Sequence, residues 1–193
     1  MLLRFLSILL LLAPGVFGQT PSLVEKVKAV LTAKPGVILS IKIIQKQFDQ
    51  SSVERGNFEI VDSGRYIFDS KEESILVDGK MIQTWNKRTR QLIIDEIVEG
   101  EFSLFDLLKG DFDQYLFTEE DQKDGKLDFS IPEIGISGSL FVDNPTGIPE
   151  KIIVRNGPDQ SLEIEINSLK TIEAPGLFSS FNPQPLEVID LRE

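Results

Sequence analysis

Residues 66–85 decide the fold, and their sequence is Tyr66-Ile67-Phe68-Asp69-Ser70-Lys71-Glu72-Glu73-Ser74-Ile75-Leu76-Val77-Asp78-Gly79-Lys80-Met81-Ile82-Gln83-Thr84-Trp85. Three runs within it (66–68, 74–77 and 81–85) are rich in β-branched and aromatic residues, which favour strands. Asp78-Gly79 between two of these runs predicts a tight hairpin, because glycine tolerates the positive φ that the turn needs. The stretch therefore predicts neighbouring antiparallel strands.

The same pattern continues on both sides of this hairpin. Short runs of strand-forming residues are separated by turn sequences such as Asp124-Gly125, Asn144-Pro145-Thr146-Gly147 and Asn156-Gly157-Pro158. Residues 162–166 alternate apolar and acidic side chains, so one face of that strand should be solvated and the other covered. Many short strands at regular spacing predict one large antiparallel sheet, curled or closed. The further expected strands are 38–48, 58–61, 91–98, 112–117, 127–131, 137–142, 150–155 and 162–166.

Two segments have the pattern of helices. Thr20-Pro21 is a favourable helix start, and apolar residues at helical spacing follow until Pro35-Gly36. A second, short helix should begin after Ser103 and end at Gly110. It is apolar almost all round, so it belongs inside the molecule. It is either ordinary core or a lid over a cavity.

The first 18 residues have the pattern of a secretory signal peptide. Arg4 precedes an apolar run at 5–13, and small residues follow up to Gly18, after which we expect cleavage. The run is too short for a membrane span, which takes about 20 residues. The expected organisation is a signal peptide at 1–18 and one domain at 19–193, located in the periplasm.

The composition argues against catalysis. The chain has no histidine and no cysteine, which removes the usual general base, the thiol nucleophile, disulfides and most transition-metal sites. Adjacent carboxylates remain at Glu72-Glu73, at Glu119-Glu120-Asp121, and at Asp111 with Asp113. A hydrolase would need two carboxyl groups about 5–9 Å apart, whereas a solvated acidic surface is the simpler interpretation. We expect no enzyme, no cofactor and no metal site.

The charge balance restricts the partners. The net charge is −11, and removing residues 1–18, whose one charged residue is Arg4, changes −11 to −12. Phosphates would be repelled by such a chain, which disfavours nucleic acid as a partner. A neutral lipid tail is unaffected by this argument. A monomer is expected.

Several segments follow one another along the chain: Gln45-Lys46-Gln47-Phe48, Tyr66-Ile67-Phe68, the hairpin at 74–80, Leu107-Leu108-Lys109-Gly110, Asp143 to Ile152, and the tail from Leu177-Phe178 through Phe181-Asn182-Pro183 to Val188-Ile189-Asp190. In this order they resemble the periplasmic outer-membrane lipoprotein carrier family, LolA. They cover most of the chain after residue 18. Asp62-Ser63 stands where that family usually has Arg-Pro, and Arg65 is the nearest arginine.

The resemblance implies a fold and a function. The fold is mainly β, a single curved antiparallel sheet forming an unclosed β-barrel covered by short α-helices. The function is a periplasmic carrier that binds lipoprotein acyl chains in an apolar cavity and moves them from the inner to the outer membrane. An inner-membrane ATP-binding cassette transporter would load it, and an outer-membrane receptor lipoprotein would unload it.

Bulky apolar residues at alternating strand positions, together with the resemblance, give a set of candidate site residues. Each could equally be ordinary core. Alternatives remain open: a related half-barrel acting as a glycolipid carrier or envelope-stress sensor, an interaction module with a filled core, or an acidic hydrolase. The candidate cavity wall is Phe58, Tyr66, Phe68, Leu76, Trp85 and Leu140, and the candidate lid residues are Phe105 and Leu108.

Overall fold

The computed structural model describes residues 21–98, 103–118, 124–157 and 159–192. The expected signal peptide and the Glu119-Glu120-Asp121 cluster lie outside the described residues. The elements are α1 (Leu23–Leu31), β1 (Val37–Gln47), β2 (Gln50–Asp62), β3 (Arg65–Ser70), β4 (Glu73–Asp78), β5 (Met81–Asn86), β6 (Gln91–Glu96), α2 (Leu104–Lys109), β7 (Leu116–Phe117), β8 (Lys126–Ile131), a 3-10 turn (Pro132–Ile134), β9 (Ile136–Asp143), β10 (Ile148–Arg155), β11 (Gln160–Thr171), α3 (Leu177–Ser180) and β12 (Glu187–Asp190).

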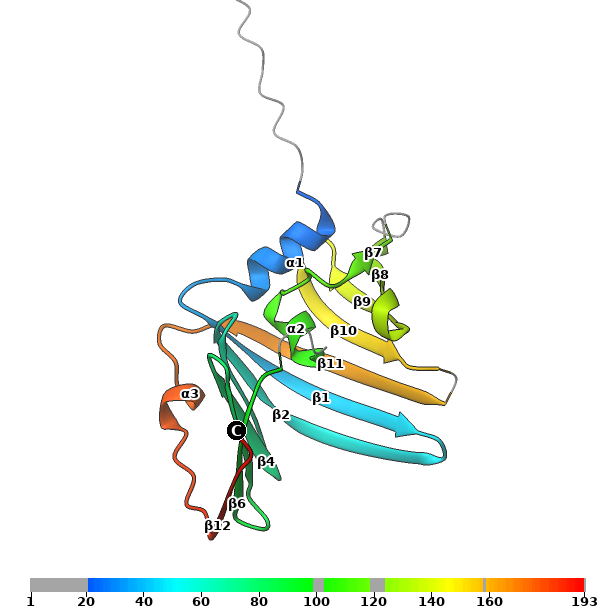
Figure 1. Ribbon diagram of the computed structural model, residues 1–193. Helices are drawn as coiled ribbons and strands as arrows, with labels where there is room; N and C mark the ends of the chain where they lie inside the picture. The colour runs from blue at the N-terminus through cyan, green and yellow to red at the C-terminus, as the bar shows by residue number, and fades with distance from the viewer. Residues whose placement is uncertain (1–20, 99–102, 119–123, 158, 193) are drawn as a thin grey trace, which may run out of the picture.

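All twelve strands belong to one sheet in the order β12-β6-β5-β4-β3-β2-β1-β11-β10-β9-β8-β7. Neighbouring strands are antiparallel except β12, which runs parallel to β6. The sheet curves strongly but does not close, so it forms an unclosed β-barrel (Figure 1). Helices α1 and α2 lie on its concave side and α3 on its outer side (Figure 1). The predicted fold class is confirmed.

The concave face carries the core. Residues directly opposite each other on antiparallel strands share a face, and Leu39, Phe58 and Phe68 are opposite one another across β1, β2 and β3. All three are buried, and they form one cluster with Val27 of α1 and Leu108 of α2. The two helices therefore cover an apolar surface that would otherwise face water.

Some boundaries differ from the prediction. The predicted strand 112–117 is wrong except at Leu116–Phe117, because the chain turns at 112–115, where the Tyr115 amide donates to the Phe112 carbonyl over 3.0 Å. Strand β2 begins at Gln50, well before the predicted residue 58. Helix α1 is capped by Ser22, whose hydroxyl accepts from the Glu25 amide. The tail forms β12, which the sequence pattern did not indicate.

The C-terminal segment is fixed to the outer face by one buried carboxylate. Glu59 is 2% exposed. Its two oxygens accept the amides of Gly176, Leu177 and Phe178 at 2.9–3.0 Å. These are the first amides of α3, which have no partner within the helix. Glu59 therefore holds α3 on the back of β2 and β3.

Replacing Glu59 tests this anchor. Glu59→Ala leaves three amides without their acceptor, so we expect the free energy of unfolding to fall by ~2–4 kcal/mol. Urea denaturation measures this change. Glu163→Ala, at a strand glutamate of β11 whose side chain lies 3.9 Å from Lys151, is the matched control and should change stability by less than about 1 kcal/mol. Equal effects of both variants would contradict the anchor.

Candidate functional site

An aromatic pocket lies at the centre of the concave face. Phe58, Tyr66 and Phe68 form its wall, and each is at most 4% exposed. Phe105 of α2 fills it: its ring stacks on Phe58 with centroids 4.9 Å apart and lies 5.8 Å from Tyr66 and 6.1 Å from Phe68. Three predicted wall residues and one predicted lid residue are thus in direct contact. The geometry is that of an apolar pocket occupied by the Phe105 side chain.

Two glycines in strands make room for aromatic rings on this face. A Cβ at Gly56 would lie 2.6 Å from the Phe68 ring, and a Cβ at Gly138 would lie 2.4 Å from the Phe129 ring. Each ring therefore lies flat over the backbone of the neighbouring strand, as aromatic residues do beside strand glycines. The sequence pattern did not indicate either glycine as part of the site.

Helix α2 has well-defined ends. The Ser103 hydroxyl accepts from the Phe105 amide over 3.3 Å, and Asp106 accepts from the Ser103 amide, so both predicted helix boundaries are confirmed. Gly110 ends the helix at φ 72°, a left-handed conformation that glycine adopts readily. Leu107 and Leu108 are 1% and 0% exposed. The second predicted lid residue, Leu108, therefore also faces the concave core.

A lysine on α2 holds the helix against the wall. Lys109 is 8% exposed, forms an ion pair with Asp106 at 2.7 Å, and lies over the Tyr66 ring at 5.0 Å. Burial, and then the nearby Asp106 carboxylate, raise the pKa of Tyr66 to about 12, against a hydrogen bond with Ser103 that lowers it. Tyr66 is therefore neutral, and its ring attracts the lysine through a cation–π contact.

Arg65 does not take part in this contact. Its guanidinium donates to the Asp62 carboxylate at 2.6 and 2.8 Å, within the turn between β2 and β3, and the Arg65 side chain is half exposed. Asp62 thus occupies the nearest arginine, and Lys109 supplies the cation that contacts Tyr66.

The sequence interpretation missed a second aromatic cluster. Phe112, Tyr115, Phe117 and Phe129 pack with centroids 5.3–6.3 Å apart. The first three follow α2 directly and had been assigned to a strand. They extend the cover from β2 and β3 to β8, so that residues 103–115 lie over the concave face and lead into β7 at the edge of the sheet.

The other predicted wall residues fall on two different faces. Leu140 lies opposite Leu127 and Ile152, is 1% exposed and belongs to the concave cluster. Leu76 lies opposite Ile67, and Trp85 lies opposite Ser74; both belong to the outer face. Trp85 and Ile67 line a hollow beside Leu177 of α3. The placement of Leu76 and Trp85 in the cavity wall was therefore wrong, because apolar bulk alone does not reveal the phase of a strand.

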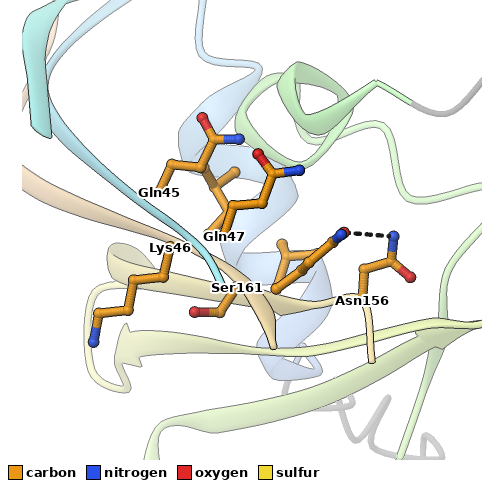
Figure 2. A pocket seen from close by; sticks show the side chains of 8 residues that line it. Gln45, Lys46, Gln47, Asn156 and Ser161 are labelled. Carbon is orange, nitrogen blue, oxygen red and sulfur yellow. Dashed lines mark hydrogen bonds between the residues drawn. The ribbon is translucent and has the colours of Figure 1, made fainter. Parts of the chain in front are cut away.

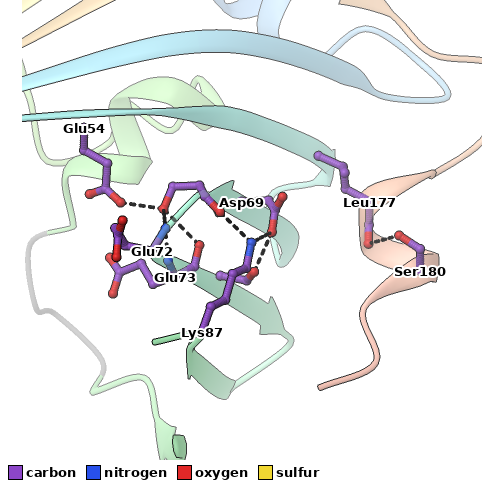
Figure 3. A network of polar contacts seen from close by, with 9 residues as sticks. Glu54, Asp69, Glu72, Glu73, Lys87, Leu177 and Ser180 are labelled. Carbon is purple, nitrogen blue, oxygen red and sulfur yellow. Dashed lines mark hydrogen bonds and ion pairs between the residues drawn. The ribbon is translucent and has the colours of Figure 1, made fainter. Parts of the chain in front are cut away.

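A network of polar side chains joins β2, β3 and β4 beyond the aromatic pocket, at the turn between β3 and β4 (Figure 3). The Ser70 hydroxyl donates to Glu54 over 2.5 Å and accepts from the Glu73 amide over 3.1 Å. Burial, and then the neighbouring Glu54 charge, raise the pKa of Glu73. On the outer face, Lys87 pairs with Asp69 at 2.7 Å. These groups mark the border of the apolar surface.

Glu73 gives a pH-dependent prediction. Because the folded protein raises the pKa of Glu73 above its ordinary value of 4.5, the ionised carboxylate lowers stability as the pH rises through that raised value. Glu73→Gln should therefore be more stable than the wild type at pH 7, and the difference should disappear below about pH 4. Thermal denaturation at both pH values measures this. Glu72→Gln, with an exposed side chain, controls for the loss of one charge; an equal gain there would contradict the explanation.

Among the described residues, buried side chains of the sheet, α1 and α2 form one continuous apolar cluster on the concave face. Two hollows lie at its margins: one of about 260 Å³ at the end of α2 beside Lys109, and one of about 140 Å³ at the far ends of β1, β10 and β11 (Figure 2). Within the described part of the chain, no group of three or more metal-binding side chains occurs. None of the described helices is long and apolar enough to cross a membrane. Residues 103–115 cover the centre of this face, where Phe105 stacks on Phe58 and Tyr115 packs against Phe129.

Solved structures resemble this fold at low sequence identity. An uncharacterised conserved protein from Thermus thermophilus superposes with a TM-score of 0.53 at 9% identity, covering 87% of this chain and 96% of that one. A LolA superfamily protein from Nitrosomonas europaea gives 0.49 at 13% identity, with 81% and 95% covered. An outer membrane lipoprotein-sorting domain from Vibrio parahaemolyticus gives 0.44 at 10% identity, with 80% and 94% covered.

An unclosed β-barrel with short helices on its concave face is the arrangement that the resemblance in sequence implied. The structure from Thermus thermophilus shares this overall fold. No protein-family model matches the chain, and no curated protein matches it. At the identities above, the likeness concerns the fold alone.

Proposed function

We propose that this LolA-like chain is a carrier that shields the acyl chains of lipoproteins. The observation that supports the proposal is the Phe105 ring, which occupies a pocket made by Phe58, Tyr66 and Phe68. In the loaded carrier, acyl chains take the place of Phe105, Leu107 and Leu108. Helix α2 is then a lid, and the concave face with Leu140 is the wall of the cavity.

The lid is suited to displacement because it is short. A helix of six residues is not stable by itself in water, so α2 keeps its structure through the side chains that it buries. Displacing it exchanges one apolar occupant of the pocket for another. An empty cavity of this kind would expose a large apolar patch and promote aggregation, and the closed lid avoids that state.

The energies allow this exchange. Each buried leucine or phenylalanine of the lid contributes roughly 1.5–3 kcal/mol. An acyl chain gains about 0.8 kcal/mol for every methylene removed from water, or on the order of 10 kcal/mol for a long chain. Two or three chains therefore outweigh the lid contacts in water. Chains that already lie in a bilayer gain little on transfer, so the lid contacts then oppose loading.

This balance fits a carrier that is loaded with the help of an energy source. The signal peptide at 1–18 would direct the protein to the periplasm. There an inner-membrane ATP-binding cassette transporter would load it with the acyl chains of a lipoprotein. A receptor in the outer membrane would accept the acyl chains from the carrier, and helix α2 would then close again. The carrier acts as a monomer, without a cofactor, and it is not an enzyme.

Three single variants test the proposal, because they should change the affinity for a lipopeptide in different ways: one should raise it, one should abolish binding and one should leave it unchanged. Phe105→Ala weakens the closed lid, so we expect a synthetic lipopeptide to bind about tenfold or more tightly, since one buried aromatic ring contributes roughly 1.5–3 kcal/mol. Phe68→Glu places a charge in the wall and should abolish binding while leaving the far-ultraviolet circular dichroism spectrum unchanged. Displacement of a hydrophobic dye measures both affinities.

Trp85→Ala is the matched control, because Trp85 is a large aromatic residue on the outer face. Its affinity for the lipopeptide should equal that of the wild type. Weaker binding by Phe105→Ala, or unchanged binding by Phe68→Glu, would refute the proposed lid and wall. Mass spectrometry of lipids that co-purify with the protein would distinguish lipoprotein from glycolipid cargo.

A further inference from the structure

The concave face changes from apolar to amide-bearing near the ends of three adjacent strands, β1, β11 and β10, and the change comes one pair earlier on β1. Along β1, Leu39, Ile41 and Ile43 are followed on the same face by Gln45 and Gln47. Along β11, Ile166, Ile164 and Leu162 are followed by Gln160. Along β10, Ile152 and Val154 are followed by Asn156, just beyond the strand.

The strand register places these changes side by side. Gln45 pairs with Leu162, and Gln47 pairs with Gln160. Leu162 in turn pairs with Val154. Gln45 therefore lies level with the last apolar residues, Leu162 and Val154, whereas Gln47 lies level with Gln160 in the next row. The side chains of Gln45, Gln47, Gln160 and Asn156 are together called the amide row. The row of amides borders the hollow of about 140 Å³, which Leu162 and Val154 also line.

The amide side chains point into the open end of the half-barrel. Figure 2 shows Gln45 and Gln47 extending to the same side, while Lys46 between them extends to the other. Asn156 donates to the Gln160 side chain over 3.4 Å, which leaves further donor and acceptor capacity on both amides. Gln45, Gln47 and Asn156 are exposed. The row thus presents uncharged hydrogen-bonding groups where the apolar surface ends.

These groups match a peptide backbone. An amide side chain offers two donors and a carbonyl acceptor without charge, as a peptide group offers one of each. Residues two apart on a strand are spaced by about 6.6 Å, which is also the repeat of an extended peptide lying along that strand. Gln45 and Gln47 have this spacing on β1. A charged lipid headgroup would instead call for cationic side chains in the row.

We propose that the amide row binds the extended peptide segment that follows the acylated residue of the cargo. This inference rests on the proposed function and adds the direction in which the cargo lies. The acyl chains run from the row toward α1, beneath the displaced α2, and the polypeptide leaves at the ends of β1, β10 and β11. The row therefore favours acylated peptides over lipids that end in a charged group.

The test compares two probes that share one acyl chain. Palmitoyl glycinamide has almost no peptide, whereas a palmitoylated hexapeptide amide of glycine, serine and alanine has a neutral extended segment. The double variant Gln45→Ala/Gln47→Ala should weaken binding of the hexapeptide probe about five- to tenfold, as expected for the loss of two side chains that hydrogen-bond the ligand. Binding of palmitoyl glycinamide should change less than about twofold.

Gln83→Ala on the outer face of β5 is the control, and it should leave both affinities unchanged. Equal loss for both probes, or no loss for either, would overturn the amide row and leave the proposed carrier function intact. Failure of the wild type to bind either probe would overturn the carrier function itself, and this inference with it. A palmitoylated sugar that loses as much affinity as the hexapeptide would also overturn the assignment to peptide.

Discussion

The structure depends on one constraint, which is that a strongly curved sheet has an apolar concave face and no second sheet to cover it. Closure of the barrel would remove the problem, but the strand order ends at β12 and β7. Helix α1, which is amphipathic, covers one part of this face. The centre is covered by α2, whose Phe105 ring stacks on Phe58. A short helix of six residues therefore makes a stacked aromatic contact at the centre of the core.

This arrangement explains how a core and a binding site can be the same surface. Protein interiors are close-packed, so a permanent cavity large enough for acyl chains would be costly. Filling it with side chains of a short segment keeps the empty protein compact. Lys109, paired with Asp106 within α2, adds a cation–π contact with the Tyr66 ring, which would be lost if α2 moved away from the sheet. In the proposed carrier, the strength of this contact would influence how easily cargo is loaded and how readily it is released.

The sequence predicted the architecture better than it predicted which residues face the cavity. The hairpin at Asp78-Gly79 and the Ser103-to-Gly110 helix were predictable because turn and cap residues act locally. Leu76 and Trp85 were misplaced because the face of a strand residue depends on register across several strands. The cluster of Phe112, Tyr115 and Phe117 was taken for a strand, since aromatic residues favour strands and the turn at 112–115 has no glycine or proline. The role of Glu59 was not predictable either, because its three partners lie more than a hundred residues away.

Hydrogen–deuterium exchange of the α2 amides tests the central claim most directly. In the closed form the Gly110 amide donates to Leu107 and the Asp111 amide donates to Asp106. The account predicts that, after saturation with a lipopeptide, amides at 106–111 exchange much faster, while those of β2 and β3 keep their protection. Protection of the α2 amides that is the same with and without bound lipopeptide would contradict it, because the lid would then remain in its pocket while the ligand bound elsewhere.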